Sequence, residues 1–338
     1  MKLIVTGGAG FIGSSFVRMA LTEGWAESVV NVDKLTYAGN LDNLRPIAGH
    51  PGYKFLQLDI CNSPAIDDLF RSEAPDAVVH FAAESHVDRS IHSPAPVILT
   101  NFNGTFALLE AARLNKVARF VHVSTDEVYG SIEPPHEADE TYPIRASSPY
   151  SASKAGSDLL ALSYFTTYKL NVSVTRASNN YGPYQFPEKL IPLMISNALE
   201  DVPLPVYGDG QQVRDWLYVE DHCHAIHTVL EKGDGGEIYN IGGNCSLPNL
   251  EVVRRILQAT GKGESLIQRV TDRPGHDRRY ALTNDKLTSK TGWEPRMDFE
   301  TGLQKTVDWY KANRDWVQRV KTGEYRQFYE LNYATRQA

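Results

Sequence analysis

The sequence predicts an α/β protein whose larger domain is a doubly wound parallel sheet with helices on both faces. In its first half, short β-branched runs alternate with segments whose apolar residues recur at helical spacing. Such alternation is typical of a parallel sheet, and its apolar strands are expected to be buried on both faces. The predicted strands are 2–6, 29–33, 54–58, 77–81, 120–124 and 172–176.

The second half is less regular and richer in proline, which predicts a smaller α/β domain there. Helical spacing recurs at 188–199, 219–230, 250–260 and 299–310, and Asp298 is placed to cap the last helix. The composition shifts after about Asn180. We therefore expect a first domain at 1–178, to which the chain returns around 213–243, and a second domain made mainly of 179–338.

Composition and charge narrow the class of protein. The chain has 338 residues, of which 42% are hydrophobic and 22% charged, as in ordinary globular proteins with a substantial core. The formal net charge is −7 and no run of Lys or Arg stands out, so we expect no nucleic-acid partner. The histidines lack ligand spacing with Cys, Asp or Glu, so no metal site is expected.

Two further features of the sequence concern the location of the protein in the cell. The first apolar run, at 3–5, is too short for a signal peptide or a membrane span. The three cysteines form no C-x-x-C pair, which makes a disulfide scaffold improbable. We expect a cytoplasmic protein that does not bind a membrane.

A glycine-rich turn follows the first strand and opens the first helix. Gly7, Gly10 and Gly13 let the backbone turn tightly and approach a pyrophosphate, which the helix N-terminus favours. Asp33 ends the next strand, and a carboxylate there accepts hydrogen bonds from ribose hydroxyls and repels a 2′-phosphate. The pattern predicts a Rossmann domain that binds NAD rather than NADP. The alternative is that the glycines only make a turn. Asp59, after the third strand, is a candidate to reach the adenine or a simple turn cap.

Tyr150 and Lys154 are four residues apart and lie on one face of a predicted helix. Free tyrosine has a pKa near ~10 and is a poor base at neutral pH. A lysine ammonium and the positive nicotinamide ring would lower that pKa, so that Tyr150 could take a proton from an alcohol. The alternative is an unremarkable surface pair on an amphipathic helix.

The hydroxyl of Thr125 and the carboxylates of Asp126 and Glu127 directly follow the fifth predicted strand, 120–124. Adjacent residues of a strand point to opposite faces, so all three can line one pocket only if the chain turns after Ser124. Two carboxylates suit proton transfer to and from carbon and oxygen, with one protonated and one ionised. The alternative for Asp126 is a turn cap or a pair with a nearby arginine.

At these residues the chain resembles the extended short-chain dehydrogenase/reductase family and, within it, the dTDP-glucose 4,6-dehydratases. The resemblance covers nearly the whole chain. Its motifs are AAESHVDRS at 82–90, STDEVYG at 124–130, YSASK at 150–154, NNYGPY at 179–184, RDWLYVED at 214–221 and DRPGHDRRY at 272–280.

The resemblance implies three steps without net oxidation. Tyr150 would deprotonate the C4 hydroxyl while NAD⁺ takes the C4 hydride. Glu127 would then remove the C5 proton while Asp126 protonates the departing C6 hydroxyl. NADH would return hydride to C6 as Glu127 reprotonates C5. Thr125 and Lys154 complete the expected catalytic set.

The resemblance also implies two sets of binding residues. The expected NAD-binding residues are Gly7, Gly10, Phe11, Ile12, Gly13, Asp33, Lys34, Leu35, Thr36, Asp59, Ile60, Phe81, Ala82, Ala83, Ser85, Thr100, Tyr150, Lys154 and Asn180. The expected sugar-nucleotide-binding residues are Ser85, Thr125, Asn179, Lys189, Leu190, Pro205, Val206, Tyr207, Arg214, Asn249, Asp272, Arg273, Pro274, Gly275 and His276. The alternative for Arg214 is a salt bridge with Asp215 or Glu220, and for His276 a structural hydrogen bond. His86, Asp88 and Arg89 are expected to support the site indirectly.

Three other functions are compatible with the same fold and cofactor. A sugar-nucleotide 4-epimerase would share the fold, the cofactor and the Tyr–Lys pair, but it needs no carboxylate pair. The substrate of a UDP-glucose 4,6-dehydratase differs from dTDP-glucose by one methyl group of the base. An idle NAD-binding sensor or scaffold would need none of the catalytic residues. The resemblance further implies a homodimer formed through helices at 94–114 and 149–169.

Overall fold

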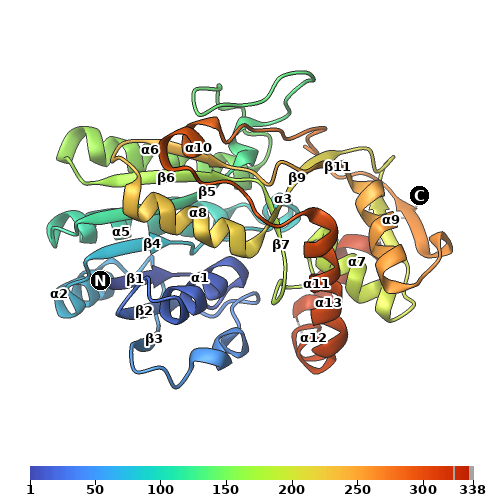
Figure 1. Cartoon of the computed structure of the whole chain (residues 1–338), viewed down its shortest axis with the longest axis horizontal. Coiled ribbons are helices and arrows are strands. Elements are labelled where there is room, and N and C mark those ends of the chain that lie inside the picture. Colours follow the sequence, from blue (N-terminus) through green and yellow to red (C-terminus); the bar gives the residue numbers. More distant parts are fainter. Residues whose placement is uncertain (323, 335–338) are drawn as a thin grey trace.

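The computed structural model describes residues 1–322 and 324–334, and its centre is a seven-stranded parallel sheet (Figure 1). The strand order is β10-β6-β5-β4-β1-β2-β3, with every neighbouring pair parallel. The strands are β1 Lys2–Thr6, β2 Ser28–Asp33, β3 Tyr53–Gln57, β4 Ala77–His80, β5 Arg119–Thr125, β6 Val172–Ala177 and β10 Ile238–Ile241. The predicted doubly wound α/β fold is confirmed.

Helices cover both faces of this sheet, as its apolar strands require. One face packs against α1 Phe11–Thr22, α8 Val219–Lys232 and α10 Asp285–Thr291. The other packs against α2 Ser63–Glu73, α5 Thr105–Leu114 and α6 Pro149–Tyr168. All six predicted strands are present, and β10, which pairs with β6 at the edge of the sheet, is a seventh strand that the sequence pattern does not predict.

The connection from β4 to β5 contains more helix than α5 alone. The short helices α3 Val87–His92 and α4 Ala95–Ile98 come first. A π-helical turn, η2 Leu99–Gly104, then joins α4 to α5. At the end of the turn, a Cβ on Gly104 would lie 2.5 Å from Ile60 Cδ1, so a larger residue there would require the Ile60 side chain to shift.

A second region lies at one end of the sheet and has its own apolar core (Figure 1). It contains a three-stranded sheet of β7 Asn179–Tyr181, β9 Val213–Tyr218 and β11 Ser246–Pro248. It also contains a two-stranded sheet of β8 Leu204–Tyr207 and β12 Ile267–Val270. Its helices are α7 Leu190–Leu199, α9 Asn249–Thr260, α11 Phe299–Ala312, α12 Arg314–Val320 and α13 Glu324–Tyr329.

Shorter elements complete the described chain. They are the 3₁₀ turns η1 Leu41–Ile47, η3 Asp126–Tyr129 and η4 Glu264–Leu266, and the π-helical turn η5 Glu330–Ala334. Asp298 caps α11 by accepting the Thr301 N–H at 2.9 Å, as predicted. Across residues 1–322 and 324–334, no helix combines the length and the apolar character that crossing a membrane would need.

Candidate active site

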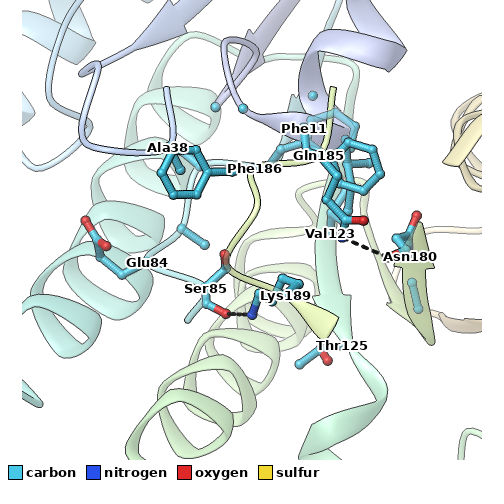
Figure 2. Close-up of a pocket in the computed structure, with 18 of the residues that line it drawn as sticks. Phe11, Ala38, Glu84, Ser85, Val123, Thr125, Asn180, Gln185, Phe186 and Lys189 are labelled. Carbon is cyan, nitrogen blue, oxygen red and sulfur yellow. Dashed lines mark hydrogen bonds between the residues drawn. The ribbon is translucent and has the colours of Figure 1, made fainter. Parts of the chain in front are cut away.

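A cavity opens at the carboxyl ends of β1, β2, β4 and β5 and is closed on its far side by residues 185–191 of the second region. Figure 2 shows how the two sides meet, with Lys189 reaching the loop after β4. The Lys189 ammonium donates to the Ser85 backbone carbonyl at 2.7 Å. The carboxyl edge of an open parallel sheet is where such folds bind ligands.

The glycine turn at the start of α1 leaves no room for side chains. Gly7 has a φ of +73°, and a Cβ there would lie 2.5 Å from the Ala82 backbone nitrogen. A Cβ on Gly13 would lie 2.3 Å from the Gly7 carbonyl oxygen. No side chain caps α1, while Phe11 and Ile12 of its first turn line the cavity. The first N–H groups of α1 are thus placed to bind a pyrophosphate, which fits the predicted dinucleotide.

Asp33 is held in a fixed position where β2 meets the cavity. Its Oδ2 accepts the Ala9 N–H at 2.9 Å and its Oδ1 accepts the Leu35 N–H at 2.8 Å. Burial raises the pKa of this carboxyl, and the two backbone hydrogen bonds oppose that rise. Because both N–H groups hold it in place, the carboxylate can receive ribose hydroxyls with little reorganisation.

Nearly all of the predicted NAD-binding residues border this cavity. The exception is Leu35, which packs against the core on the α1 face of the sheet. Asp59 lines the cavity, and its Oδ1 accepts the Cys61 N–H at 2.9 Å, as the turn-cap alternative predicts. Its contact with the adenine stays a prediction. The Lys34 ammonium lies 3.1 Å from Asp59 Oδ2.

The chain turns where the proposed carboxylate pair requires it. Strand β5 runs to Thr125, one residue beyond the predicted end, and η3 begins at Asp126. The Thr125 hydroxyl accepts the Glu127 N–H at 3.2 Å and donates to Asp126 Oδ1 at 3.3 Å. This turn places Thr125, Asp126 and Glu127 on the wall of one cavity.

Asp126 and Glu127 occupy different environments. Asp126 is buried, and its Oδ2 has no hydrogen-bond partner within the described residues. Burial, followed by the negative charge of Glu127, raises the pKa of Asp126 well above its usual value. Glu127 is less buried and borders a second cavity as well. The neutral form is therefore favoured at Asp126, as a general acid requires.

Tyr150 and Lys154 lie in the first turns of α6, which Ser148 caps through the Ser151 N–H. The Lys154 ammonium donates to the Val123 carbonyl at 2.8 Å, and burial lowers the pKa of Lys154 to about 8. The residues around Tyr150 do not by themselves lower its pKa, in contrast to the prediction. Burial and the Glu127 charge raise that pKa, and the hydrogen bond with the Thr125 side chain opposes them only in part.

A second cavity continues from the first toward the second region. Both are bordered by Glu127, Asn179, Glu188, Lys189, Leu190 and Trp216. Of the predicted sugar-nucleotide residues, the second cavity is also bordered by Pro205, Val206, Tyr207, Arg214, Asn249, Arg273 and His276. Asp272, Pro274 and Gly275 do not border it. Ser85 and Thr125 lie on the first cavity. The two cavities form one cleft, with Glu127 at the junction.

Arg214 is held by carbonyls rather than by carboxylates. Its guanidinium donates to the Asp277 carbonyl at 2.9 Å and the Val213 carbonyl at 2.8 Å, and it lies 4.1 Å from the centre of the Tyr280 ring. The carboxylate of Asp215 instead accepts two backbone N–H groups. The Arg214 charge therefore remains available to a phosphate in the cleft.

His276 lies beside Asp272 at the same end of the cleft. Its Nδ1 is 2.6 Å from Asp272 Oδ1. Burial and the Arg273 charge lower the pKa of His276 to about 4. The ring is therefore neutral at physiological pH and combines a structural hydrogen bond with a place on the cavity wall.

The structure adds residues that spacing in the sequence did not single out. Glu188 borders both cavities and accepts the Tyr37 hydroxyl at 3.0 Å, and burial raises its pKa to about 7. Asn101, in η2, donates to Ser153 Oγ at 2.9 Å and to the Glu84 carbonyl at 3.0 Å. It thereby ties the loop after β4 to the helix that carries Lys154. Only its contacts across the fold reveal this role.

A parallel sheet of this order, with the Tyr–Lys pair on the same cavity as the glycine turn, is the arrangement of the extended short-chain dehydrogenases/reductases. The profile of the GDP-mannose 4,6 dehydratase family matches residues 4–306. A dTDP-glucose 4,6-dehydratase of Shigella flexneri is 52% identical over 362 aligned positions that cover 100% of both chains.

Solved structures agree with this assignment. The dTDP-glucose 4,6-dehydratase of Streptomyces venezuelae, crystallised with NAD, superimposes with a TM-score of 0.93 at 49% identity, covering 95% of this chain and 100% of that one. The UDP-glucose 4-epimerase of Thermus thermophilus, in complex with NAD, superimposes with a TM-score of 0.86 at 33% sequence identity. The match covers 93% of this chain and 100% of the epimerase chain. The chain belongs to the dTDP-glucose 4,6-dehydratase family.

Proposed function

We propose that the chain converts dTDP-glucose into dTDP-4-keto-6-deoxyglucose and water as an NAD-dependent hydro-lyase. The observation that carries this function is the carboxylate pair, in which a buried Asp126 favours its neutral form beside Glu127 at the junction of the cleft. The higher identity to the dehydratase than to the epimerase supports the same choice.

The first step needs a base at the C4 hydroxyl. Bound NAD⁺ supplies the acceptor for the two electrons and the hydrogen that leave C4, and it later returns them to C6. Tyr150 accepts the hydroxyl proton, with Thr125 hydrogen-bonded to the same phenol group. Because Tyr150 has a raised pKa in the protein alone, the positive charge of the nicotinamide ring is needed to make the phenol acidic enough.

In the second step, Glu127 and Asp126 have different roles. The C4 ketone makes the C5 proton acidic, and Glu127 removes it. Asp126 donates its proton to the C6 hydroxyl, which leaves as water. Glu127 then returns a proton to C5 and ends ionised, as it began. Asp126 ends ionised and Tyr150 ends protonated, so one proton must pass from Tyr150 to Asp126 before the next turnover. The raised pKa of Asp126 keeps its proton available at neutral pH for this donation.

NAD and the sugar nucleotide are bound mainly by different parts of the chain. Residues 1–178, with a return around 213–243, form the NAD-binding domain, and 179–338 mainly bind the sugar nucleotide. In support of the return, β10 pairs with β6 at the edge of the large sheet. Arg214 is assigned to the diphosphate, and the nucleoside to the second cavity. A cytoplasmic location fits cysteines that are all free.

We also propose that the protein is a homodimer. Large apolar side chains are exposed along 94–114 and 149–169, among them Leu99 at 54%, Phe106 at 46% and Leu159 at 57%. These two stretches pack against each other through α5, η2 and α6, so their exposed side chains form one surface. A second copy of this surface is a suitable apolar cover for it.

Product analysis tests the function. Purified protein is incubated with dTDP-glucose, and the products are identified by NMR. We expect a 4-keto-6-deoxy sugar nucleotide, with UDP-glucose converted more slowly, because a methyl contact is worth about 1–3 kcal/mol. An Asp126→Asn variant serves as the matched control and should give little product. Formation of a galactose epimer alone, or no conversion at all, would contradict the proposal.

A further inference from the structure

The helix that carries Tyr150 and Lys154 also carries a buried carboxylate that the proposed reaction does not use. Asp158 lies one helical turn after Lys154 on α6, and its side chain is fully buried. It borders neither cavity of the cleft. Arg176 of β6 donates through Nε to Asp158 Oδ2 at 2.9 Å, and its side chain is buried as well. Both charges of this ion pair are therefore enclosed by protein.

A second contact connects the same part of α6 to β5. His122 Nε2 lies 3.4 Å from Asp158 Oδ1 and 3.1 Å from Ser157 Oγ. In the sequence His122 directly precedes Val123, whose carbonyl accepts the Lys154 ammonium at 2.8 Å. The strand residue that meets Asp158 thus adjoins the one that holds Lys154. A shift of α6 along β5 would disturb both contacts.

The arginine of the ion pair also reaches the turn that carries the catalytic carboxylates. The Arg176 guanidinium lies 4.9 Å from the centre of the Tyr129 ring, and Tyr129 ends η3, which begins at Asp126. The Tyr129 hydroxyl donates to Asn240 Oδ1 at 2.7 Å, so the same turn is also held to β10. Because Arg176 contacts both Asp158 and Tyr129, the ion pair connects α6 to η3.

The carboxylate of Asp158 stays charged in spite of its burial. Burial alone would raise its pKa, but the hydrogen bond with His122 and the charge of Arg176 outweigh that effect and lower the pKa. Burial lowers the pKa of Lys154, and the Asp158 charge opposes this. On β4 and β5, burial lowers the pKa of His80 and that of His122, the latter to about 4, so both rings are neutral. Asp158 therefore supplies a negative charge that supports the Lys154 ammonium.

The other titratable groups around α6 differ from Asp158 in their state or in their partners. Burial and then the Glu127 charge raise the pKa of Asp126 and that of Tyr150, so both groups are neutral in the protein alone. The charged residues of α3 and α5 near α6 form ion pairs, which are Asp88 with Arg273, Arg89 with Glu188, and Glu110 with Arg113.

We propose that Asp158 is a positioning residue for Lys154, because it holds α6 against β5 and η3 and provides the counter-charge for the ammonium during C4 oxidation. The inference rests on the proposed function for the reaction in which Lys154 takes part. It adds to the site a residue that lies outside the cleft. Because an opposite charge stabilises the charged form of a lysine, loss of the Asp158 charge should make Lys154 lose its proton at a lower pH.

Asp158→Asn tests the proposal, because it removes the charge and nearly keeps the shape. We expect the alkaline limb of the kcat profile, where Lys154 loses its proton, to move at least about one pH unit lower. KM for dTDP-glucose should stay within about threefold of the wild type, since Asp158 lies outside the cleft. A partly unfolded variant would instead lose active enzyme without a shift of this limb.

A second variant separates the charge from stability. Asp158→Leu combined with Arg176→Met replaces the whole ion pair by apolar side chains, which is often tolerated where the loss of one partner is not. This double variant should show the same shift of the alkaline limb as Asp158→Asn, with a higher midpoint of urea unfolding. It keeps the proposal testable if Asp158→Asn does not fold.

Urea unfolding without substrate gives a measurement that is independent of activity. The free energy of unfolding rises with pH where folded Lys154 loses its proton, because the unfolded chain still binds that proton. In Asp158→Asn and in the double variant this rise should begin at least about one pH unit lower than in the wild type. Each protein is compared with the same protein carrying Lys154→Met.

Val307→Ala is the matched control for a loss of stability. Val307 lies on α11, and its side chain is fully buried in the core of the second region, away from the cleft. Its truncation leaves a cavity and lowers the free energy of unfolding. The alkaline limb of kcat and the pH at which the free energy of unfolding begins to rise should match the wild type.

Two outcomes would overturn the inference. One is a wild-type alkaline limb in Asp158→Asn and in the double variant, whether or not KM changes. The other is an equal shift of the limb in Val307→Ala. Failure of the proposed function looks different: the wild type would then leave dTDP-glucose unconverted, while urea unfolding would still show whether Asp158 acts on Lys154.

Discussion

The Glu127 N–H donates to the Thr125 hydroxyl at 3.2 Å, and this bond marks the end of strand β5. A threonine at the start of a helical turn satisfies an N–H group that has no other partner. Here it also sets the direction in which two neighbouring carboxylates leave the backbone.

Replacing Thr125 should therefore affect the carboxylates as well as the sugar. Thr125→Val keeps the shape but removes the hydroxyl, and we expect at least a tenfold loss of kcat together with a loss of about 1 kcal/mol in the free energy of unfolding. Thr125→Ser keeps the cap and should retain activity within about threefold. Urea unfolding and product formation measure the two effects. Wild-type kcat in Thr125→Val would show that the hydroxyl is not needed.

The separate roles of Glu127 and Asp126 predict that their variants differ in deuterium incorporation at C5. In deuterated water, Glu127→Gln should still oxidise C4 but should incorporate no deuterium at C5, because its amide cannot accept that proton. Asp126→Asn should exchange the C5 proton while losing water much more slowly. Mass spectrometry of the sugar nucleotide reports both. Normal C5 exchange in Glu127→Gln would contradict the assigned role.

Lys154 should make stability depend on pH in the alkaline range. Burial lowers its pKa to about 8 in the folded protein, below the value of about 10.4 expected in the unfolded chain. Between these values the unfolded state binds more protons, so the free energy of unfolding rises with pH. Relative to Lys154→Met, the wild type should gain about 2 kcal/mol between about pH 8 and pH 10. A pH-independent difference in urea unfolding would show that the lysine titrates normally.

Asp33 should exclude NADP. Its carboxylate already accepts two backbone N–H groups, so it cannot move away from a 2′-phosphate without breaking them. We expect the wild-type apoenzyme to regain activity with NAD but not with NADP. Asp33→Asn should shift the preference toward NADP at least tenfold, measured by reconstitution with each cofactor. Equal reconstitution of the wild type by both would refute this role.

The proposed dimer predicts that a charge at its centre separates the subunits. Leu159→Arg should give a monomer in analytical ultracentrifugation at micromolar concentration, because the buried guanidinium would have no partner. Leu41→Arg is the matched control: it alters an exposed leucine on η1, away from this surface, and should leave the mass unchanged. A wild-type monomer would disprove the assembly.

The features of the site that could be predicted from the sequence are those set by short spacing. The glycine turn before α1, Asp33 at the end of β2 and the pair Tyr150 and Lys154 each depend on a few consecutive residues, whose pattern reflects one strand or one helix. The turn after β5 could also be inferred, because three functional side chains in a row require the strand to end.

Contacts between distant segments could not be predicted in this way. Glu188 meets Tyr37, and Asn101 meets Ser153, only because the chain folds back on itself. The resemblance predicts only indirect support of the site by Asp88, and the fold alone brings Asn332 to it. No periodicity in a single sequence records such pairs.

By itself the sequence determined the α/β class, the NAD-binding turn and the chemical groups available for catalysis, because local spacing and residue type are enough for these. Tertiary structure decided the state of those groups. Burial and the nearby Glu127 raise the pKa of both Asp126 and Tyr150, and burial lowers that of Lys154. Desolvation and charge act through space, so they depend on which parts of the chain meet in the cleft and not on their order along it.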